Sequence, residues 1–162
     1  AKDPGDLIYV VGATYEEIAA RILPEDLRKS FFRISTRDSR DILANSDFAF
    51  IKSGTSSLEA ALAGVPFLIT YKISPLSWFI GSMLIKSSMK GLVNLIADEK
   101  IVPELYQSDA KPEALARVSL EYLSDAVKSA EMRSKLAGIR ERLSVRCASE
   151  TAATMVNGYL RG

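Results

Sequence analysis

The chain has 162 residues, and its 48% apolar and 25% charged residues are those of an ordinary globular protein with a sizeable core. Its net charge of +1 gives no global field that would favour nucleic acid, so we expect no nucleic-acid partner. The absence of histidine excludes Ser-His and Cys-His nucleophiles and the usual zinc sites.

Short apolar strands and helices alternate in the first half of the chain. The runs expected to form strands are mostly apolar and rich in β-branched or aromatic residues: 7–11, 31–35, 48–51 and 67–71. The helices expected between them cover 14–22, 38–45 and 56–63. This alternation predicts an α/β fold, with a Rossmann-like parallel sheet and helices on both of its faces.

The second half is more helical. Residues 112–146 show amphipathic stripes, and a final helix is expected at 149–160. The apolar stretch Pro75–Ile85 is most typical of core or of an interdomain contact, but it also suits peripheral contact with a membrane surface or an acyl chain. Because no repeat or linker is evident, residues 1–162 are expected to form one domain that ends in several C-terminal helices.

The features that report on cellular location favour the cytoplasm. The single cysteine, Cys147, excludes an internal disulfide framework and fits a reducing compartment. No apolar run reaches the roughly 18 residues of a membrane-spanning helix. The first residues, AKDPGD, lack the pattern of a signal peptide. We therefore expect a cytoplasmic domain.

The segment SGTSSLEAALAGVP, Ser53 to Pro66, directly follows one expected strand and opens the next helix. Helix N-termini at the carboxyl edge of a parallel sheet carry unpaired N–H groups that suit a phosphate, and Gly54 would let a ligand approach the backbone closely. The alternative is plain capping, because Ser56 and Glu59 form the S-x-x-E pattern of a capping box. The residues of this segment alone favour capping.

Three polar residues stand among aliphatic ones further along the chain: Asn94, Glu104 and Gln107. Glu104 and Gln107 are three apart and would share one face of a helix. They could line a pocket, but polar groups on the surface of short helices give the same spacing. Spacing alone favours the surface interpretation.

The order of these stretches resembles a known family. The patterns S-G-T-x-S/T-L-E, G-V/T-P, Y-K/R-x-S/T-P, P-N-L-L/I-A-G and V/P-x-E-L-x-Q follow one another in the C-terminal half of lipid-A-disaccharide synthase, an inverting glycosyltransferase of the two-domain GT-B type. This chain is similar to that half from about Leu7 to its C-terminus. It departs from the fourth pattern, with Val93 in place of the usual proline and Asp98 in place of the usual glycine.

The resemblance implies a reaction and a site. The sugar of UDP-2,3-diacylglucosamine would be transferred to an acylated acceptor sugar phosphate, 2,3-diacylglucosamine 1-phosphate, giving the β-1,6-linked lipid A disaccharide and UDP. It implies no metal or other cofactor, since the helix N-terminus and side chains stabilise the leaving UDP in such enzymes. The residues that it implies for nucleotide-sugar binding are Ser53, Gly54 and Thr55 by the diphosphate, Glu59 at the ribose, and Asn94, Glu104 and Gln107 along the rest of the pocket. Ser57 is also expected among the nucleotide-sugar-binding residues.

Full-length family members are much longer, so the resemblance implies a truncated C-terminal donor-binding domain that is inactive alone. The general base would belong to the absent N-terminal domain, and no residue of this chain is predicted to be catalytic. The intact enzyme would work at the inner face of the cytoplasmic membrane, and self-association stays open. Two alternatives remain: another UDP-sugar GT-B enzyme, such as the peptidoglycan N-acetylglucosaminyltransferase, or a non-catalytic Rossmann-like module that binds a nucleotide or a protein partner.

Overall fold

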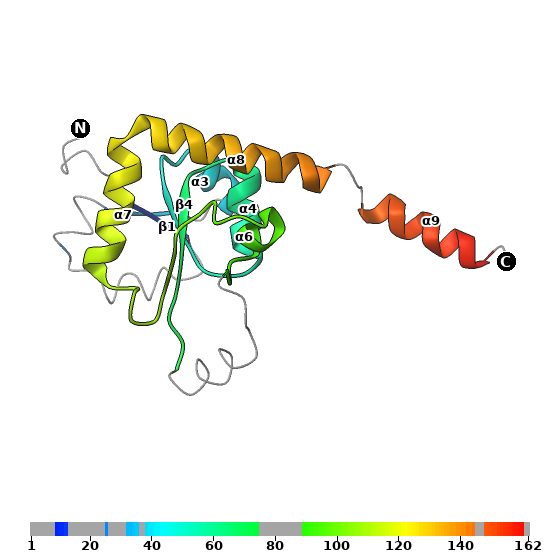
Figure 1. Ribbon diagram of the computed structural model, residues 1–162, viewed down its shortest axis with the longest axis horizontal. Helices are drawn as coiled ribbons and strands as arrows, with labels where there is room; N and C mark the ends of the chain where they lie inside the picture. The colour runs from blue at the N-terminus through cyan, green and yellow to red at the C-terminus, as the bar shows by residue number, and fades with distance from the viewer. Residues whose placement is uncertain are drawn as a thin grey trace.

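The computed structural model describes residues 9–12, 25, 32–35, 38–74, 89–144 and 148–160. Its elements in chain order are β1 (Tyr9–Gly12), β2 (Phe32–Ser35), α3 (Ser39–Ala44), β3 (Ala49–Ile51), α4 (Thr55–Ala63), β4 (Phe67–Tyr71), α6 (Leu92–Ala97), β5 (Glu104–Tyr106), α7 (Pro112–Ser124), α8 (Ala126–Ser144) and α9 (Ala148–Leu160). Figure 1 shows α8 lying along one side of the molecule and α9 projecting beyond it. The predicted α/β fold is confirmed.

Every strand pairing among the described residues is parallel. β1 pairs with β2, and β3, β4 and β5 pair in that order as a separate sheet. Strand β4 is therefore the central strand of the larger sheet, with Ile69 opposite Ile51 on one side and Glu104 on the other. Because the strands are parallel, the loops after β3, β4 and β5 emerge at one edge of the sheet.

The core forms around β4. Phe67 and Ile69 are fully buried in a cluster with α4, Val93 of α6 and Leu136 of α8. Leu68, the residue between them, is equally buried, and alternation along the strand turns it to the opposite face, where α7 contacts β4. Burying each of these larger side chains contributes about 1.5–3 kcal/mol. Helices thus cover both faces of β4, as the sequence predicts.

Several expected elements are confirmed within one or two residues, and others need correction. Strand β5 was not predicted; the spacing of Glu104 and Gln107 was considered only for the case of a helix, and Glu104 lies on a strand instead. The amphipathic region 112–146, where two stripes were expected, contains the two helices α7 and α8. It breaks at Asp125, whose Oδ1 accepts hydrogen bonds from the N–H groups of Val127 and Lys128 and so starts α8. The expected helix at 14–22 and the apolar stretch Pro75–Ile85 lie outside the described residues.

The part of the chain that the structure describes holds neither a membrane-spanning helix nor a cluster of metal ligands. No helix in the described part of the chain is long and apolar enough to cross a membrane. Within the same residues, no three His, Cys, Asp or Glu side chains gather where they could hold a metal ion.

Candidate functional site

The carboxyl edge of the larger sheet collects most of the predicted site. Strand β3 ends at Ile51 and leads through Lys52, Ser53 and Gly54 into α4. Strand β4 ends at Tyr71, and β5 ends at Tyr106 directly before Gln107. Open parallel sheets bind ligands at this edge, because helix N-termini converge there.

Helix α4 begins without a side-chain cap. Gly54 occupies the N-cap position with φ 131° and ψ −157°, a conformation open to glycine but strained for other residues. A Cβ added to Gly54 would meet no atom within 4 Å, so the backbone here faces open space. Ser57 is buried, and its hydroxyl donates to the Gly54 carbonyl at 2.6 Å, which fixes the loop from inside. The α4 start is thus a rigid, exposed end of a helix.

The predicted capping box is wrong. Because Gly54 takes the N-cap position, the helix already includes Thr55 and Ser56, and no side chain makes a cap hydrogen bond at this end. Glu59 does not reach back to the helix start. Its Oε2 instead accepts a 3.3 Å hydrogen bond from the Ser39 hydroxyl at the start of α3. The open positions at the α4 start, Gly54 and Thr55, are exposed.

Asn94 is fully buried in α6, so its interpretation as surface polarity is wrong. Its Oδ1 accepts from the N–H groups of Ile101 at 2.8 Å and Val102 at 2.9 Å. Its Nδ2 donates to the Val102 carbonyl at 2.9 Å and to Glu104 Oε1 at 2.7 Å. The side-chain amide therefore ties α6 to the loop and the strand that follow it.

Glu104 fills the start of α6. Its Oε1 accepts from the Gly91 N–H at 2.9 Å, and its Oε2 accepts from the Lys90 N–H at 3.0 Å. A Cβ on Gly91 would lie 2.8 Å from Glu104 Oε1 and would clash with Ile69 Cδ1, so this close approach favours glycine. The carboxylate is held where a bound anion would otherwise lie.

Gln107 joins the chain segments that leave β4 and β5. Its Oε1 accepts from the Ile73 N–H at 2.8 Å, and its Nε2 donates to the Ile73 carbonyl at 3.0 Å. Gln107 itself has φ 49°, in the left-handed region. These two hydrogen bonds fix the path of residues 71–74 past the end of the sheet.

The position at which the resembled family usually has glycine is the C-cap of α6. Asp98 adopts φ 54° there, and its N–H donates to the Leu95 carbonyl, so the left-handed cap is kept. Aspartate is one of the residues that tolerate this region. Asp98 is exposed and lies at the opposite end of α6 from Gly91.

Tyr106 lies between the two helix starts. Burial raises the pKa of its hydroxyl well above the ordinary value, and the Glu104 carboxylate raises this pKa further, while an interaction with the Ser53 side chain lowers it. The hydroxyl is therefore neutral throughout the physiological range.

Sequence reasoning did not single out Lys52, which directly precedes the loop into α4. Its Nζ lies 5.0 Å from the centroid of the Tyr71 ring, a cation–π contact that holds a positive charge beside the loop into α4. Two signals were available: the lysine directly precedes S-G-T, and the tyrosine belongs to a pattern shared with the resembled family.

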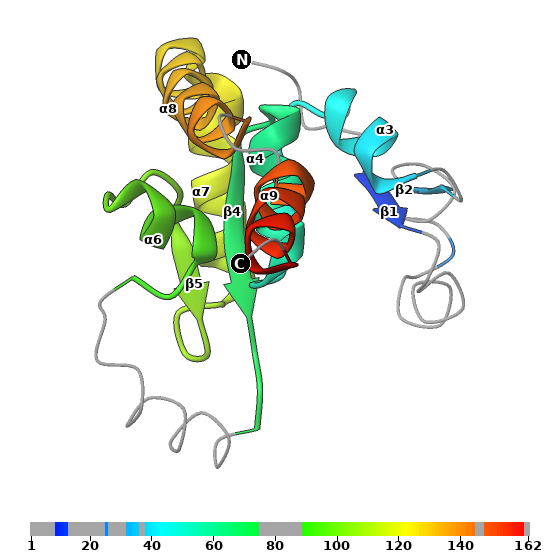
Figure 2. The same ribbon diagram turned by 90° about the vertical axis from the view of Figure 1, so that its right-hand side faces the viewer.

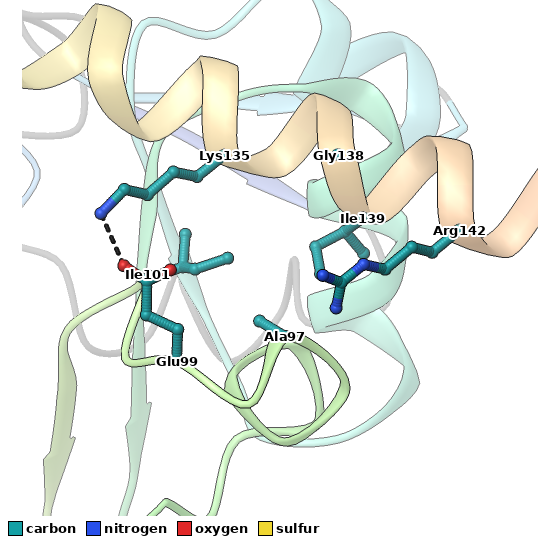
Figure 3. A pocket seen from close by; sticks show the side chains of 7 residues that line it. All are labelled: Ala97, Glu99, Ile101, Lys135, Gly138, Ile139 and Arg142. Carbon is teal, nitrogen blue, oxygen red and sulfur yellow. Dashed lines mark hydrogen bonds and ion pairs between the residues drawn. The ribbon is translucent and has the colours of Figure 1, made fainter.

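A pocket of about 120 Å³ lies elsewhere, between the C-terminal end of α6 and α8 (Figure 3). The cations at its rim already have partners. Lys135 Nζ bonds Glu99 at 2.7 Å, and Arg142 Nη1 donates to the Ile96 carbonyl at 3.3 Å. The pocket contains none of the predicted site residues. Its polar groups serve to fasten α8 to α6.

The fold and the edge define a class of protein: a Rossmann-like α/β domain with a glycine-led helix start at the carboxyl edge of its parallel sheet, an arrangement suited to anionic ligands. Comparison with known proteins gives the family. A family model described as lipid-A-disaccharide synthetase matches residues 5–156. The chain belongs to the lipid-A-disaccharide synthase family.

Relatives named lipid-A-disaccharide synthase support this assignment. The protein from Sulfurihydrogenibium sp. (strain YO3AOP1) is 39% identical over 122 residues, covering 75% of this chain and 31% of the relative. The protein from Solibacter usitatus (strain Ellin6076) is 38% identical over 139 residues, covering 85% and 36%. The protein from Syntrophus aciditrophicus (strain SB) is 40% identical over 115 residues, covering 71% and 30%. The chain spans about a third of the length of these relatives.

Proposed function

We propose that this chain is the donor-binding domain of a lipid-A-disaccharide synthase. The complete enzyme would transfer the diacylglucosamine unit of UDP-2,3-diacylglucosamine, with inversion, to 2,3-diacylglucosamine 1-phosphate. The observation that carries the proposal is the uncapped, exposed start of α4 in a chain whose residues 5–156 match this family. The general base and the acceptor site would lie in other parts of the enzyme, so this chain alone would be inactive.

The start of α4 would bind the diphosphate. Backbone N–H groups at a helix N-terminus and the helix dipole stabilise negative charge, and that charge grows on UDP as it leaves. Ser53, Gly54 and Thr55 present the backbone, and the exposed conformation of Gly54 supports close approach of a phosphate. Lys52, beside the same loop, would add a positive charge.

Glu59 would accept hydrogen bonds from the ribose hydroxyls. Its carboxylate is exposed, and its 3.3 Å bond from Ser39 is long enough that a ribose hydroxyl could replace it. Ser57 would act differently from its neighbours, because its hydroxyl holds the Gly54 carbonyl and so fixes the loop rather than the ligand.

Asn94, Glu104 and Gln107 would shape the remaining wall of the donor site. Their polar atoms bond protein groups: Asn94 and Glu104 order the start of α6, and Gln107 fastens Ile73. We expect their contribution to be rigidity of the site, since a wall that keeps its shape without ligand lowers the cost of ordering on binding. Such an enzyme would act at the cytoplasmic face of the membrane, with peripheral contact that gives access to its acylated substrates.

Calorimetric titration with UDP and with uridine tests the proposal. UDP should bind at least tenfold more tightly than uridine, because only UDP carries the charge that the α4 start stabilises. Glu59→Ala should weaken UDP binding roughly ten- to hundredfold, the loss of a charged hydrogen bond worth about 1.5–3 kcal/mol. Glu113→Ala, which changes an exposed glutamate in the first turn of α7, is the matched control and should leave binding unchanged. Absence of UDP binding would contradict the donor-site proposal, and unchanged binding by Glu59→Ala would contradict the ribose contact alone.

A further inference from the structure

Two neighbouring strands bring a positive charge and an aromatic ring together at one edge of the larger sheet. Lys52 directly follows β3, which ends at Ile51, and Tyr71 is the last residue of β4. The Lys52 Nζ lies 5.0 Å from the centroid of the Tyr71 ring. Because β3 and β4 are parallel, their carboxyl ends lie at the same edge. The pair therefore lies at the edge that also holds the start of α4.

The Tyr71 ring is carried by backbone that β5 and Gln107 hold in place. Figure 2 shows β4 and β5 side by side with their carboxyl ends pointing the same way, and Tyr71 lies opposite Tyr106 in this pair. The Tyr71 carbonyl accepts a hydrogen bond from the Gln107 N–H at 3.2 Å. The Gln107 side chain then bonds both the N–H and the carbonyl of Ile73, two residues further on. The ring thus gives the Lys52 side chain a fixed support.

The contact with Tyr71 orients the Lys52 charge without neutralising it. In the part of the chain that the structure describes, no carboxylate forms an ion pair with Lys52. Lys135 of α8, by contrast, pairs with Glu99 at 2.7 Å and with Glu131 at 3.3 Å. An aromatic ring attracts a cation through its quadrupole and carries no net charge of its own. The positive charge of Lys52 is therefore available to a ligand.

Lys52 is also close enough to act on a ligand at the start of α4. Gly54, the N-cap of α4, follows two residues later, so the two Cα atoms are at most about 7.6 Å apart. An ammonium group has three donors, so one side can rest on a ring while another donates to a phosphate oxygen. Holding a long, flexible side chain in place before the ligand arrives lowers the entropy that binding costs.

We propose that Lys52 sets the preference of the donor site for a diphosphate over an uncharged nucleoside, and that Tyr71 is the positioning residue that holds Lys52 for this role. The proposal rests on the proposed function, because it concerns the same diphosphate at the start of α4. An ammonium group carries a full positive charge, whereas a helix N-terminus carries roughly half of one. Lys52 should therefore account for a large share of the preference for charge.

Binding of UDP and of uridine to variants of the 162-residue chain tests the role of Lys52. Lys52→Met removes the charge and keeps a long side chain, so it should weaken UDP binding roughly tenfold. Uridine binding, followed by NMR because it is weak, should change less than about twofold. Lys52→Arg keeps the charge and stacks on aromatic rings, so it should bind UDP within about threefold of the wild type.

Lys100→Met is the matched control for the loss of charge. Lys100 is exposed and precedes β5, so it lies at the opposite edge of the sheet from Lys52. This variant loses the same charge and should leave UDP binding unchanged. Circular dichroism checks that each variant is folded.

A double-mutant cycle tests the role of Tyr71. Tyr71→Leu removes the ring and should weaken UDP binding about threefold, because the ammonium group is no longer held in place. In the Lys52→Met background the same change should have no further effect, since no charge is left to position. Tyr71→Phe keeps the ring face and should bind UDP as the wild type does.

Ionic strength separates a role of the Lys52 charge from a role of its packing. Salt screens exposed charges, so the difference between the wild type and Lys52→Met should narrow from roughly tenfold to about threefold or less as salt rises from about 0.02 to 0.5 M. A difference that is the same at all salt concentrations would overturn the proposal, because packing does not depend on screening.

The remaining outcomes distinguish this proposal from the proposed function. If the wild-type chain does not bind UDP, the donor site itself is contradicted and this proposal fails with it. If the wild type binds UDP and Lys52→Met binds it equally well, the role of Lys52 is overturned while the donor site stands. If Tyr71→Leu weakens UDP binding equally with and without Lys52, Tyr71 does not act through Lys52, and its positioning role is overturned.

Discussion

Two helices of the same core, α4 and α6, begin in opposite ways. The start of α4 has a glycine at the N-cap, no side-chain cap and an exposed backbone. The start of α6 is occupied by the carboxylate of Glu104, which accepts from two backbone N–H groups and from Asn94. At the start of α6 the negative charge comes from a residue of the chain itself. The start of α4 is open to a negative charge from a ligand. This difference is the reason why we propose the start of α4, and not that of α6, for an anionic ligand.

The largest expected effect comes from breaking the filled helix start at Asn94. Asn94→Ala leaves the N–H groups of Ile101 and Val102 unpaired in the core and should lower the free energy of unfolding by about 3–5 kcal/mol. Urea denaturation measures it. Asn45→Ala is the control, because Asn45 is exposed and donates one hydrogen bond, to the Asp41 carbonyl. Its effect should be below about 1 kcal/mol. Equal losses for the two variants would contradict the structural role of Asn94.

A smaller effect is expected from crowding the same helix start. Gly91→Ala forces Glu104 and Ile69 to move and should cost about 1–3 kcal/mol. Gly138→Ala is the matched control, since a Cβ at Gly138 in α8 meets no atom within 4 Å. It should stabilise the protein by up to about 1 kcal/mol, because alanine is the better helix former. Thermal unfolding measures the two changes in stability, which should have opposite signs. A Gly91→Ala variant as stable as the wild type would show that Glu104 is not tightly held.

The smallest effect concerns Tyr106, which lies between the two starts. Its pKa is raised in the folded protein, so the folded state keeps the phenol proton longer than the unfolded state does. The resulting stabilisation is present below the ordinary tyrosine pKa of about 10 and is lost as pH rises through the raised pKa. The wild-type protein should therefore lose stability between about pH 9 and 11. Tyr106→Phe should make this loss smaller by no more than about 1 kcal/mol, because Tyr106 is only half-buried.

The control for this measurement is Tyr159→Phe, a change at a tyrosine that is 90% exposed. That variant should keep the pH dependence of the wild-type protein. Burial also raises the pKa of Tyr122, so some alkaline dependence should remain in Tyr106→Phe. A pH profile of Tyr106→Phe that matches the wild type would contradict the burial of the Tyr106 hydroxyl.

The alternation of elements could be predicted because the signals are local. The run at 48–51 is continuously apolar and the run at 67–71 nearly so, and glycine and proline at 64 and 66 mark the end of α4. The short strand β5 could not be predicted in this way. Its three residues carry little pattern, and pairing with β4 decides their conformation, as in the bond from the Ile69 N–H to the Pro103 carbonyl. Tertiary context overrides propensity in such short segments.

The candidate site was predictable in position but less so in detail. Sequence placed S-G-T at the end of a strand, and the structure agrees. The S-x-x-E pattern predicted the wrong helix start, at Ser56. The helix begins after Gly54, because the backbone conformation of that glycine sets its start. Burial of Asn94 had no local signal either, since its partners are up to ten residues away in sequence. The break between α7 and α8 did have a local signal in the sequence. Asp125 is a typical N-cap residue, but the amphipathic pattern around it obscured this.

The central claim is that the start of α4 binds a diphosphate and the start of α6 does not. The most direct test is a titration of the isotope-labelled chain with UDP, following the backbone amide resonances at both helix starts. We predict saturable shifts of the Gly54 and Thr55 amides, with the Lys90 and Gly91 amides unmoved because Glu104 already holds them. Saturable shifts at Lys90 and Gly91 without shifts at Gly54 and Thr55 would contradict the claim.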